Sequence, residues 1–423
     1  MNYKKTTLKN GLRIITVPMK DNNTTTVMVL VEAGSNYEDK KNNGISHFLE
    51  HVCFKGTDKR PTSAVINHEL DAIGSQSNAF TGNEYTGYYA KAHHSKTEKL
   101  MDIVSDIYLN STLPEAEIEK EKGVIVEEIN MYEDLPQRKV VEVYENLLYD
   151  GSSAGLTILG PRENIKNMKR EDFLNYRNEH YLSGATTVVV SGKMNEQKVI
   201  KQIEKLFSGI KKGKPAVLPK VSFVQKKPQV KLFYKETDQT HLVIGFRAFE
   251  RGDRRNSTLG LLSTILGGGM SSRLFQKMRE ELGICYYVRS SKNTYRTHGD
   301  FAISAGVSNA RVREAVSGIM AEIKKMTVES ISEAELRKAK DYSIGNMFLA
   351  LESSDSLADF FGFQELLHDK KIKTAEDIVK DIEKVSSKDI LKLSKEIFKN
   401  SSLNLAVVGP YKDEKEFLDI LSV

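Results

Sequence analysis

The sequence places two histidines and a glutamate in the order His47-Phe-Leu-Glu50-His51. On a helix, His47 and His51 are one turn apart and face the same side, while Glu50 lies on the adjoining flank. Two imidazoles on one helical face are a common start of a zinc site, and a nearby carboxylate that does not bind the metal can accept a proton from water. The chain holds only nine histidines, so a chance pair at this spacing beside a glutamate is uncommon. The motif therefore predicts zinc-dependent hydrolysis.

A catalytic zinc needs a third protein ligand, and the acidic segment 115–133 contains candidates. Glu121 and Glu128 lie two helical turns apart, so they share one face of the helix predicted there. One of them can bind the metal while the other supports a ligand. Glu127 is adjacent to Glu128, and spacing alone does not exclude it.

Strands and helices must position these residues. β-rich runs at 12–17, 26–33 and 242–247 predict strands, and segments of helical period at 97–109 and 312–326 predict helices. In each half of the chain the strands come first and the helices follow. This order is typical of an α+β fold in which helices pack on a mostly antiparallel sheet.

Two pairs of segments repeat at almost the same spacing. Residues 115–122 (EAEIEKEK) align with 333–340 (EAELRKAK), and TVVVSG at 187–192 aligns with LAVVG at 405–409. Two matches at one spacing predict a duplicated domain.

The boundary between the two copies is predicted where the composition changes. Residues 209–228 combine charges, two glycines and three prolines, a composition that opposes regular structure and suits a linker. We therefore expect a metal-bearing domain at 1–208 and a related domain without metal at 229–423.

Composition excludes several other classes of protein. The 423 residues include 62 Lys and Arg against 57 Asp and Glu, a net charge of +5 that indicates no nucleic-acid partner. No apolar run approaches the length needed to cross a bilayer, so no membrane partner is expected. Cys53 and Cys285 are too few for a disulfide framework and suit reduced thiols. We expect a cytoplasmic protein.

The His47-x-x-Glu50-His51 motif, followed by Glu121-Lys-Gly-Val-Ile-Val-Glu-Glu128, resembles the pitrilysin/insulinase superfamily, most closely its mitochondrial-processing-peptidase-like bacterial branch. The resemblance implies that His47, His51 and Glu128 bind one Zn2+ per chain. It also implies that Glu50 is the general base and that Glu121 supports a ligand without binding the metal. The preference for Glu128 over its neighbour rests on this resemblance.

A second stretch of the first half resembles a substrate-binding element of the same family. Asn78, Ala79, Phe80 and Thr81 are similar to its edge strand, to which an extended peptide adds by main-chain pairing. The resemblance implies a preference for unfolded peptides.

The later half lacks the metal motif. It contains no His-x-x-Glu-His, and it has Asn346 where the repeat places Glu128. Arg279 and Tyr286 resemble an arginine and a tyrosine that bind substrate and stabilise the transition state in the family, as a cation and a phenol can for a developing oxyanion. Tyr287 lies beside Tyr286 and could be confused with it.

The resemblance implies a zinc metalloendopeptidase whose two related domains form half of a clamshell around an enclosed chamber. We expect a homodimer in which Arg279 and Tyr286 face the zinc of the partner chain. The alternative is a non-catalytic or partner-dependent subunit of a processing-peptidase-like complex, since the superfamily includes such subunits. The complete metal motif favours the enzyme.

Overall fold

Runs of β-branched residues form a six-stranded sheet in the first half of the chain. The computed structural model, which describes residues 2–367 and 372–423, orders this sheet β1-β2-β6-β3-β5-β4. β2 and β6 are parallel and the other neighbours are antiparallel. The strands are β1 (Lys4–Thr7), β2 (Arg13–Pro18), β3 (Thr24–Val31), β4 (Gln76–Thr81), β5 (Thr86–His93) and β6 (Thr186–Gly192).

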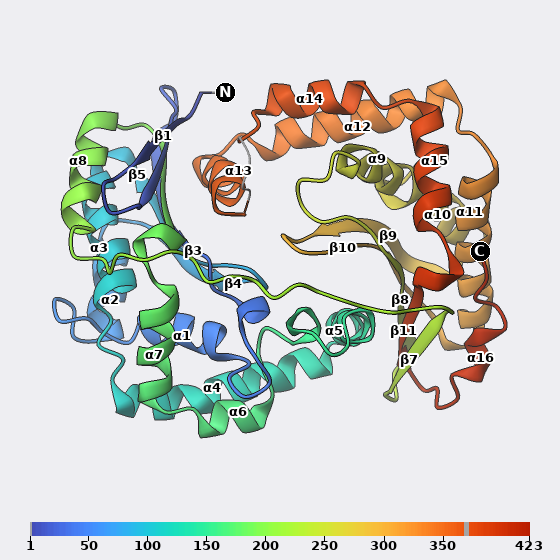
Figure 1. Cartoon of the computed structure of the whole chain (residues 1–423), viewed down its shortest axis with the longest axis horizontal. Coiled ribbons are helices and arrows are strands. Elements are labelled where there is room, and N and C mark those ends of the chain that lie inside the picture. The colour runs from blue at the N-terminus through green and yellow to red at the C-terminus, as the bar shows by residue number, and fades with distance from the viewer. Residues whose placement is uncertain (1, 368–371) are drawn as a thin grey trace. The chain divides into compact units, whose positions relative to one another are not determined.

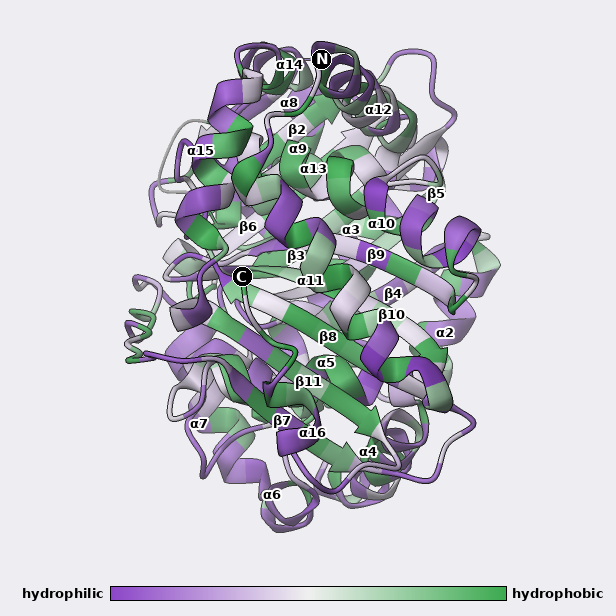
Figure 2. Cartoon of the chain, turned by 90° about the vertical axis from the view of Figure 1, so that its right-hand side faces the viewer, coloured by the Kyte–Doolittle hydropathy of each residue, from purple (hydrophilic) through white to green (hydrophobic). Residues whose placement is uncertain are grey.

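A second sheet has the order β7-β11-β8-β10-β9, which repeats the order of the last five strands of the first sheet. Its parallel pair, β7 and β11, occupies the place of β2 and β6. β8 and β11 are largely hydrophobic (Figure 2). The strands are β7 (Gln229–Tyr234), β8 (Gln239–Arg247), β9 (Cys285–Thr294), β10 (Gly299–Ser308) and β11 (Leu403–Gly409).

Helices also lie between the strands of both halves, at 45–72 and 256–275, so the expected order of strands first and helices afterwards is not observed. None of the helices in the described ranges is long and apolar enough to cross a membrane. The α-helices in the first half are α1 (Ile45–Cys53), α2 (Ser63–Ala72), α3 (Thr97–Asn110), α4 (Glu115–Asp134), α5 (Pro136–Leu148), α6 (Arg162–Asn167), α7 (Arg170–His180) and α8 (Glu196–Leu206). Those in the second half are α9 (Asn256–Gly267), α10 (Arg273–Phe275), the π-helical turn η5 (Gln276–Glu281), α11 (Val312–Val328), α12 (Glu333–Ala350), α13 (Ser354–Leu367), α14 (Ala375–Glu383), α15 (Ser387–Ile397) and α16 (Lys415–Leu418).

The chain forms two compact units, each built around one sheet. The first unit comprises Met1–Ile129, Leu156–Pro219 and Phe348–Thr374, and the second comprises Asn130–Gly155, Lys220–Met347 and Ala375–Val423. These units do not follow the continuous ranges 1–208 and 229–423 expected from the sequence. Each half of the sequence contributes one helix to the sheet of the other half.

The exchanged helices are α5 and α13. α5 packs on β8 and β11 in the second unit, where its buried Val140 and Val143 join an apolar cluster with Val243 (Figure 1). α13 packs on β3 and β6 in the first unit. A side chain at Gly362 of α13 would lie 2.9 Å from Leu30 and Val189, so glycine allows the helix its close approach to the sheet.

The architecture confirms the predicted α+β class with mostly antiparallel sheets. The strands predicted at 12–17, 26–33 and 242–247 form β2, β3 and β8, and the predicted helices form α3 and α11. Residues 209–228 form neither helix nor strand.

Candidate metal centre

The helix that carries the histidine motif is anchored on one side and capped at its start. Phe48, Leu49 and Val52 of α1 are fully buried in the core of the first unit. Gly44 precedes the helix with a φ of 99°, and a Cβ there would lie 2.6 Å from the carbonyl oxygen of Leu159. Only glycine therefore fits this position without strain.

A buried carboxylate caps the same helix. Glu38 accepts hydrogen bonds from the backbone N–H groups of Gly44 (2.8 Å) and Ser46 (2.9 Å), and from the Asn43 side chain (2.8 Å). An anion at a helix N-terminus satisfies donors that have no partner within the helix. Burial raises the pKa of Glu38, although these hydrogen bonds oppose the rise. Sequence reasoning missed this residue, because no periodic pattern connects it to the motif.

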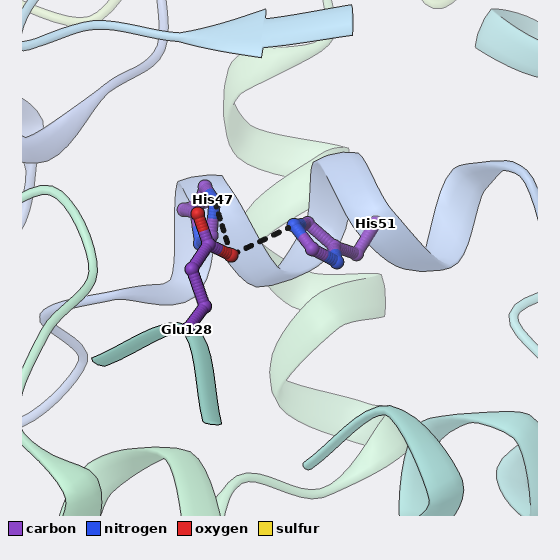
Figure 3. A group of neighbouring side chains, drawn as sticks. All are labelled: His47, His51 and Glu128. Atoms are coloured by element: carbon purple, nitrogen blue, oxygen red, sulfur yellow. Dashed lines mark ion pairs between the residues drawn. The ribbon is translucent and has the colours of Figure 1, made fainter. Parts of the chain in front are cut away.

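The two histidines face the same side of α1, as their spacing predicts. Their ring centroids lie 4.6 Å apart. The Nε2 atoms of His47 and His51 each lie 3.6 Å from the same oxygen, Oε2 of Glu128 (Figure 3). Within the described ranges this trio is the one group of His, Cys, Asp or Glu side chains placed to hold a metal ion.

The packing of α4 selects which acidic side chains reach α1. Ile118, Ile125 and Ile129 are buried and hold one face of α4 against the core. Glu121 and Glu128 lie along that face, whereas Glu127 is exposed. Spacing alone did not exclude Glu127 as the third ligand. Because the isoleucine face of α4 is buried, the helix is oriented so that Glu128, and not Glu127, lies near the histidines.

The donor set fits zinc. Bonds of about 2.0–2.1 Å at tetrahedral angles put neighbouring ligand atoms about 3.4 Å apart. The two distances from the histidine Nε2 atoms to Oε2 of Glu128, 3.6 Å each, are close to that value. The ligand atoms of all three residues lie within 4.8 Å of one another. Nitrogen from histidine and oxygen from glutamate are ordinary zinc donors, and three protein ligands leave a position for water or substrate.

The two histidines differ in their surroundings. Burial, followed by the charge of His51, lowers the pKa of His47 to about 3, which keeps it neutral as a ligand must be. Burial also disfavours charge on His51, but its hydrogen bond to Glu121 (3.0 Å) and the nearby carboxylates outweigh burial and raise its pKa. A metal at His51 would therefore compete with a proton.

Glu50 lies beside the trio and is held by the edge strand. Only 9% of Glu50 is exposed, and it accepts a hydrogen bond of 2.6 Å from the hydroxyl of Thr81. Burial raises the pKa of Glu50, opposed by that hydrogen bond. A carboxylate with a raised pKa is a stronger base, as general-base chemistry requires.

The segment 78–81 lies at an edge of the first sheet. It ends β4, the edge strand of the first sheet, and β4 pairs with β5 on one side. The Asn78 side chain accepts a hydrogen bond from the backbone N–H of Ala79. The Phe80 ring lies 6.0 Å from that of Tyr85 and 5.9 Å from that of Phe363 on α13. Thr81 has the additional contact with Glu50 that sequence reasoning did not foresee.

Arg279 and Tyr286 lie together in the second unit. The Arg279 guanidinium donates a hydrogen bond to the Tyr286 carbonyl oxygen and lies 5.3 Å from the centre of its ring. The Tyr286 side chain is 73% exposed. The hydroxyl of its neighbour Tyr287 instead lies 3.1 Å from Nδ1 of His241. Tyr286 is thus the more accessible phenol of the two.

Among the described residues of the later half, the repeat forms no second metal group. Ala339 and Asn346 of α12 stand where the repeat places Glu121 and Glu128. Ala339 is buried in the core of the second unit, and the amide of Asn346 donates to the carbonyl oxygen of Tyr342. The repeat thus forms a helix at α12, but this helix lacks carboxylates at the positions that correspond to Glu121 and Glu128.

Lys55 is a further side chain near the site that sequence reasoning missed. Its ammonium lies 2.6 Å from Oε2 of Glu121, whose other oxygen contacts His51. Burial by itself would raise the pKa of Glu121. The hydrogen bonds from His51 and Lys55 act in the opposite direction and together have the larger effect, so the pKa of Glu121 is lowered. The spacing of Lys55, one turn beyond His51, is the signal that could have found it.

Family models match two consecutive segments of the chain. The model described as insulinase (peptidase family M16) matches residues 13–162, which contain the trio. The model described as peptidase M16 inactive domain matches residues 167–342, which do not include the trio.

Relatives resemble the chain over nearly its whole length. An uncharacterized zinc protease of Bacillus subtilis (strain 168) is 34% identical over 408 residues, which cover 96% of this chain and 98% of the relative. An uncharacterized zinc protease of Rickettsia felis is 34% identical over 411 residues, which cover 97% and 98%.

Two solved structures share the fold. The crystal structure of a protease from Helicobacter pylori matches with a TM-score of 0.89 and 23% identity, covering 97% of this chain and 99% of that one. A structure of a peptidase M16 inactive domain from Pseudomonas fluorescens matches with a TM-score of 0.87 and 15% identity over the same shares.

Proposed function

Because the chain belongs to the insulinase family, peptidase family M16, we propose that it is a zinc-dependent endopeptidase that hydrolyses peptide bonds in unfolded peptides. One observation carries the proposal. The Nε2 atoms of His47 and His51 converge on one oxygen of Glu128 at 3.6 Å, with the buried carboxylate of Glu50 on the adjoining flank of the same helix.

The chain's residues divide the chemistry among them. His47, His51 and Glu128 would hold one zinc ion. When bound, zinc polarises a peptide carbonyl and lowers the pKa of a water molecule. Glu50, which the Thr81 hydroxyl holds at 2.6 Å, accepts the proton of the attacking water and passes it to the leaving amine.

Substrate binding is proposed to use the edge strand and the second unit. The edge of β4 that faces away from β5 offers main-chain donors and acceptors to an extended peptide, which favours an unfolded substrate. Arg279 and Tyr286 would bind substrate and stabilise the developing oxyanion. We also propose that the protein is a cytoplasmic homodimer, with these two residues facing the zinc of a second copy around an enclosed chamber.

The competing function is a non-catalytic or partner-dependent subunit. The names of the relatives favour a protease, and the four residues of the motif are all in place. A scaffold does not require this full set.

Metal content and cleavage of a quenched fluorescent peptide by the purified chain test the proposal. We expect about one zinc per chain, as one three-ligand site implies, and cleavage that a chelator abolishes. Zinc without cleavage would indicate a required partner chain. Neither zinc nor cleavage would favour the scaffold and refute the proposal.

A further inference from the structure

Lys55 connects the two helices that carry the metal-binding trio. It follows α1 by two residues, one turn beyond His51, and its Nζ lies 2.6 Å from Oε2 of Glu121 on α4. The other oxygen of Glu121, Oε1, lies 3.0 Å from Nδ1 of His51. One carboxylate therefore bridges His51 of α1 and Lys55 in the turn that follows this helix.

This bridge is shielded from solvent. The side chain of Glu121 is 8% exposed, and those of His51 and Lys55 are 21% and 23% exposed. Because the Glu121 carboxylate is nearly buried, loss of its cation would leave a charge that bulk water solvates poorly, so this ion pair contributes more than an exposed one.

The bridge decides which nitrogen of His51 is available to a metal. A proton on Nδ1 that is donated to Glu121 leaves the Nε2 lone pair free and sets the plane of the ring. His47 has no equivalent support in the part of the chain that the structure describes, since its buried Nδ1 has no hydrogen-bond partner there. Of the two histidines, His51 is therefore the one whose ring is oriented by a hydrogen bond to another described side chain.

A glutamate side chain on a helix can rotate about its torsions unless both oxygens are held. Lys55 holds Oε2 of Glu121 and leaves Oε1 for His51. Glu121 also lies two turns before Glu128 on the same face of α4, so the contact sets the register between α1 and the helix that supplies the third ligand.

We infer that Lys55 is a positioning residue of the zinc site, which holds Glu121 in the orientation that fixes His51. The inference rests on the proposed function, because it presumes that His47, His51 and Glu128 bind zinc. Its test measures zinc affinity directly and needs no peptidase activity.

The experiment titrates zinc into each protein in competition with a chromogenic chelator. We expect Lys55→Met to weaken zinc binding about tenfold, at the lower end of the 10–100-fold loss typical of residues that support a metal ligand. Lys55→Arg keeps the charge and should restore most of the affinity. Lys120→Met is the matched control, because Lys120 adjoins Glu121 but is 70% exposed and pairs with Glu117.

A double-mutant cycle separates positioning from a general effect on folding. If Lys55 acts through Glu121, Lys55→Met should cost little further affinity in a Glu121→Gln background. Additive losses would overturn the inference, because Lys55 would then act independently of Glu121. Circular dichroism checks folding, and if Lys55→Met does not fold, Lys55→Gln takes its place in the cycle.

The outcomes distinguish this inference from the proposed function. Wild-type protein that binds no zinc would overturn both. Wild-type protein that binds zinc, together with a folded Lys55→Met or Lys55→Gln variant of equal affinity, would overturn the role of Lys55 alone.

Discussion

Replacing Thr81 by valine removes the hydrogen bond that holds Glu50 and keeps the size of the side chain. The bond is 2.6 Å long, and Glu50, which accepts it, is only 9% exposed, so bulk water does not readily take its place. A hydrogen bond to a charged group contributes about 1.5–3 kcal/mol. If that orientation is needed in the transition state, the loss corresponds to a decrease in kcat of about 10- to 150-fold.

The kinetic constants discriminate between two roles of Thr81. Resemblance assigns it to the substrate-binding edge strand, whereas the structure adds its contact with Glu50. Loss of base positioning should lower kcat with KM unchanged, and loss of a ground-state contact with substrate should raise KM with kcat unchanged.

The assay is cleavage of a quenched fluorescent peptide over a range of concentrations, with zinc content measured on the same samples. Thr81→Ser keeps the hydroxyl and should recover most of kcat. A Thr81→Val variant with full zinc content and kcat within about twofold of wild type, less than one net hydrogen bond is worth, would refute the reasoning.

Further predictions concern the site and one buried acid. Glu50→Gln should retain zinc but lose about 10²- to 10⁴-fold in kcat, the usual contribution of a general base; unchanged turnover would remove Glu50 from that role. His51→Ala should lose both zinc and activity, and full metal stoichiometry in this variant would contradict the ligand assignment. Arg279→Ala should weaken hydrolysis with metal content unchanged, by up to about 10²- to 10³-fold if its guanidinium bonds the oxyanion; unaltered kinetics would argue against that role. Burial raises the pKa of Asp300 from 3.8 to about 6, against the hydrogen bonds that it accepts. Since the folded state then holds the proton more tightly than the unfolded chain, the free energy of unfolding should fall as pH rises from about 4 to about 6. Urea unfolding should show a shallower fall for Asp300→Asn, and identical pH profiles would contradict the shift.

The local part of the site was predictable from sequence because the helical period is a local property. His47 and His51 face the same side of α1 wherever that helix packs, and Glu121 and Glu128 share a face of α4 for the same reason. The strand predicted near Asn78 is the edge strand β4. The α+β class also followed from strands and helices that do not alternate strictly along the chain.

Contacts between elements were not predictable in the same way, because they depend on how each element is rotated and placed against its neighbours. Burial of Ile125 and its neighbours on α4 turns Glu128 toward the histidines and leaves Glu127 exposed. Thr81 meets Glu50 only once β4 lies beside α1.

Sequence by itself determined which side chains can form a metal-binding group, since residue types and helical spacing define the donor set. Tertiary structure decided what surrounds that set. Lys55 contacts Glu121 of α4, and Glu38 accepts hydrogen bonds from backbone N–H groups at the start of α1. The spacing of Lys55 from His51 is a local signal, but no sequence spacing connects either residue with the groups that it contacts. The exchange of α5 and α13 between the two sheets is likewise a matter of packing. An apolar helix face specifies that it must be buried, and the fold decides which sheet buries it.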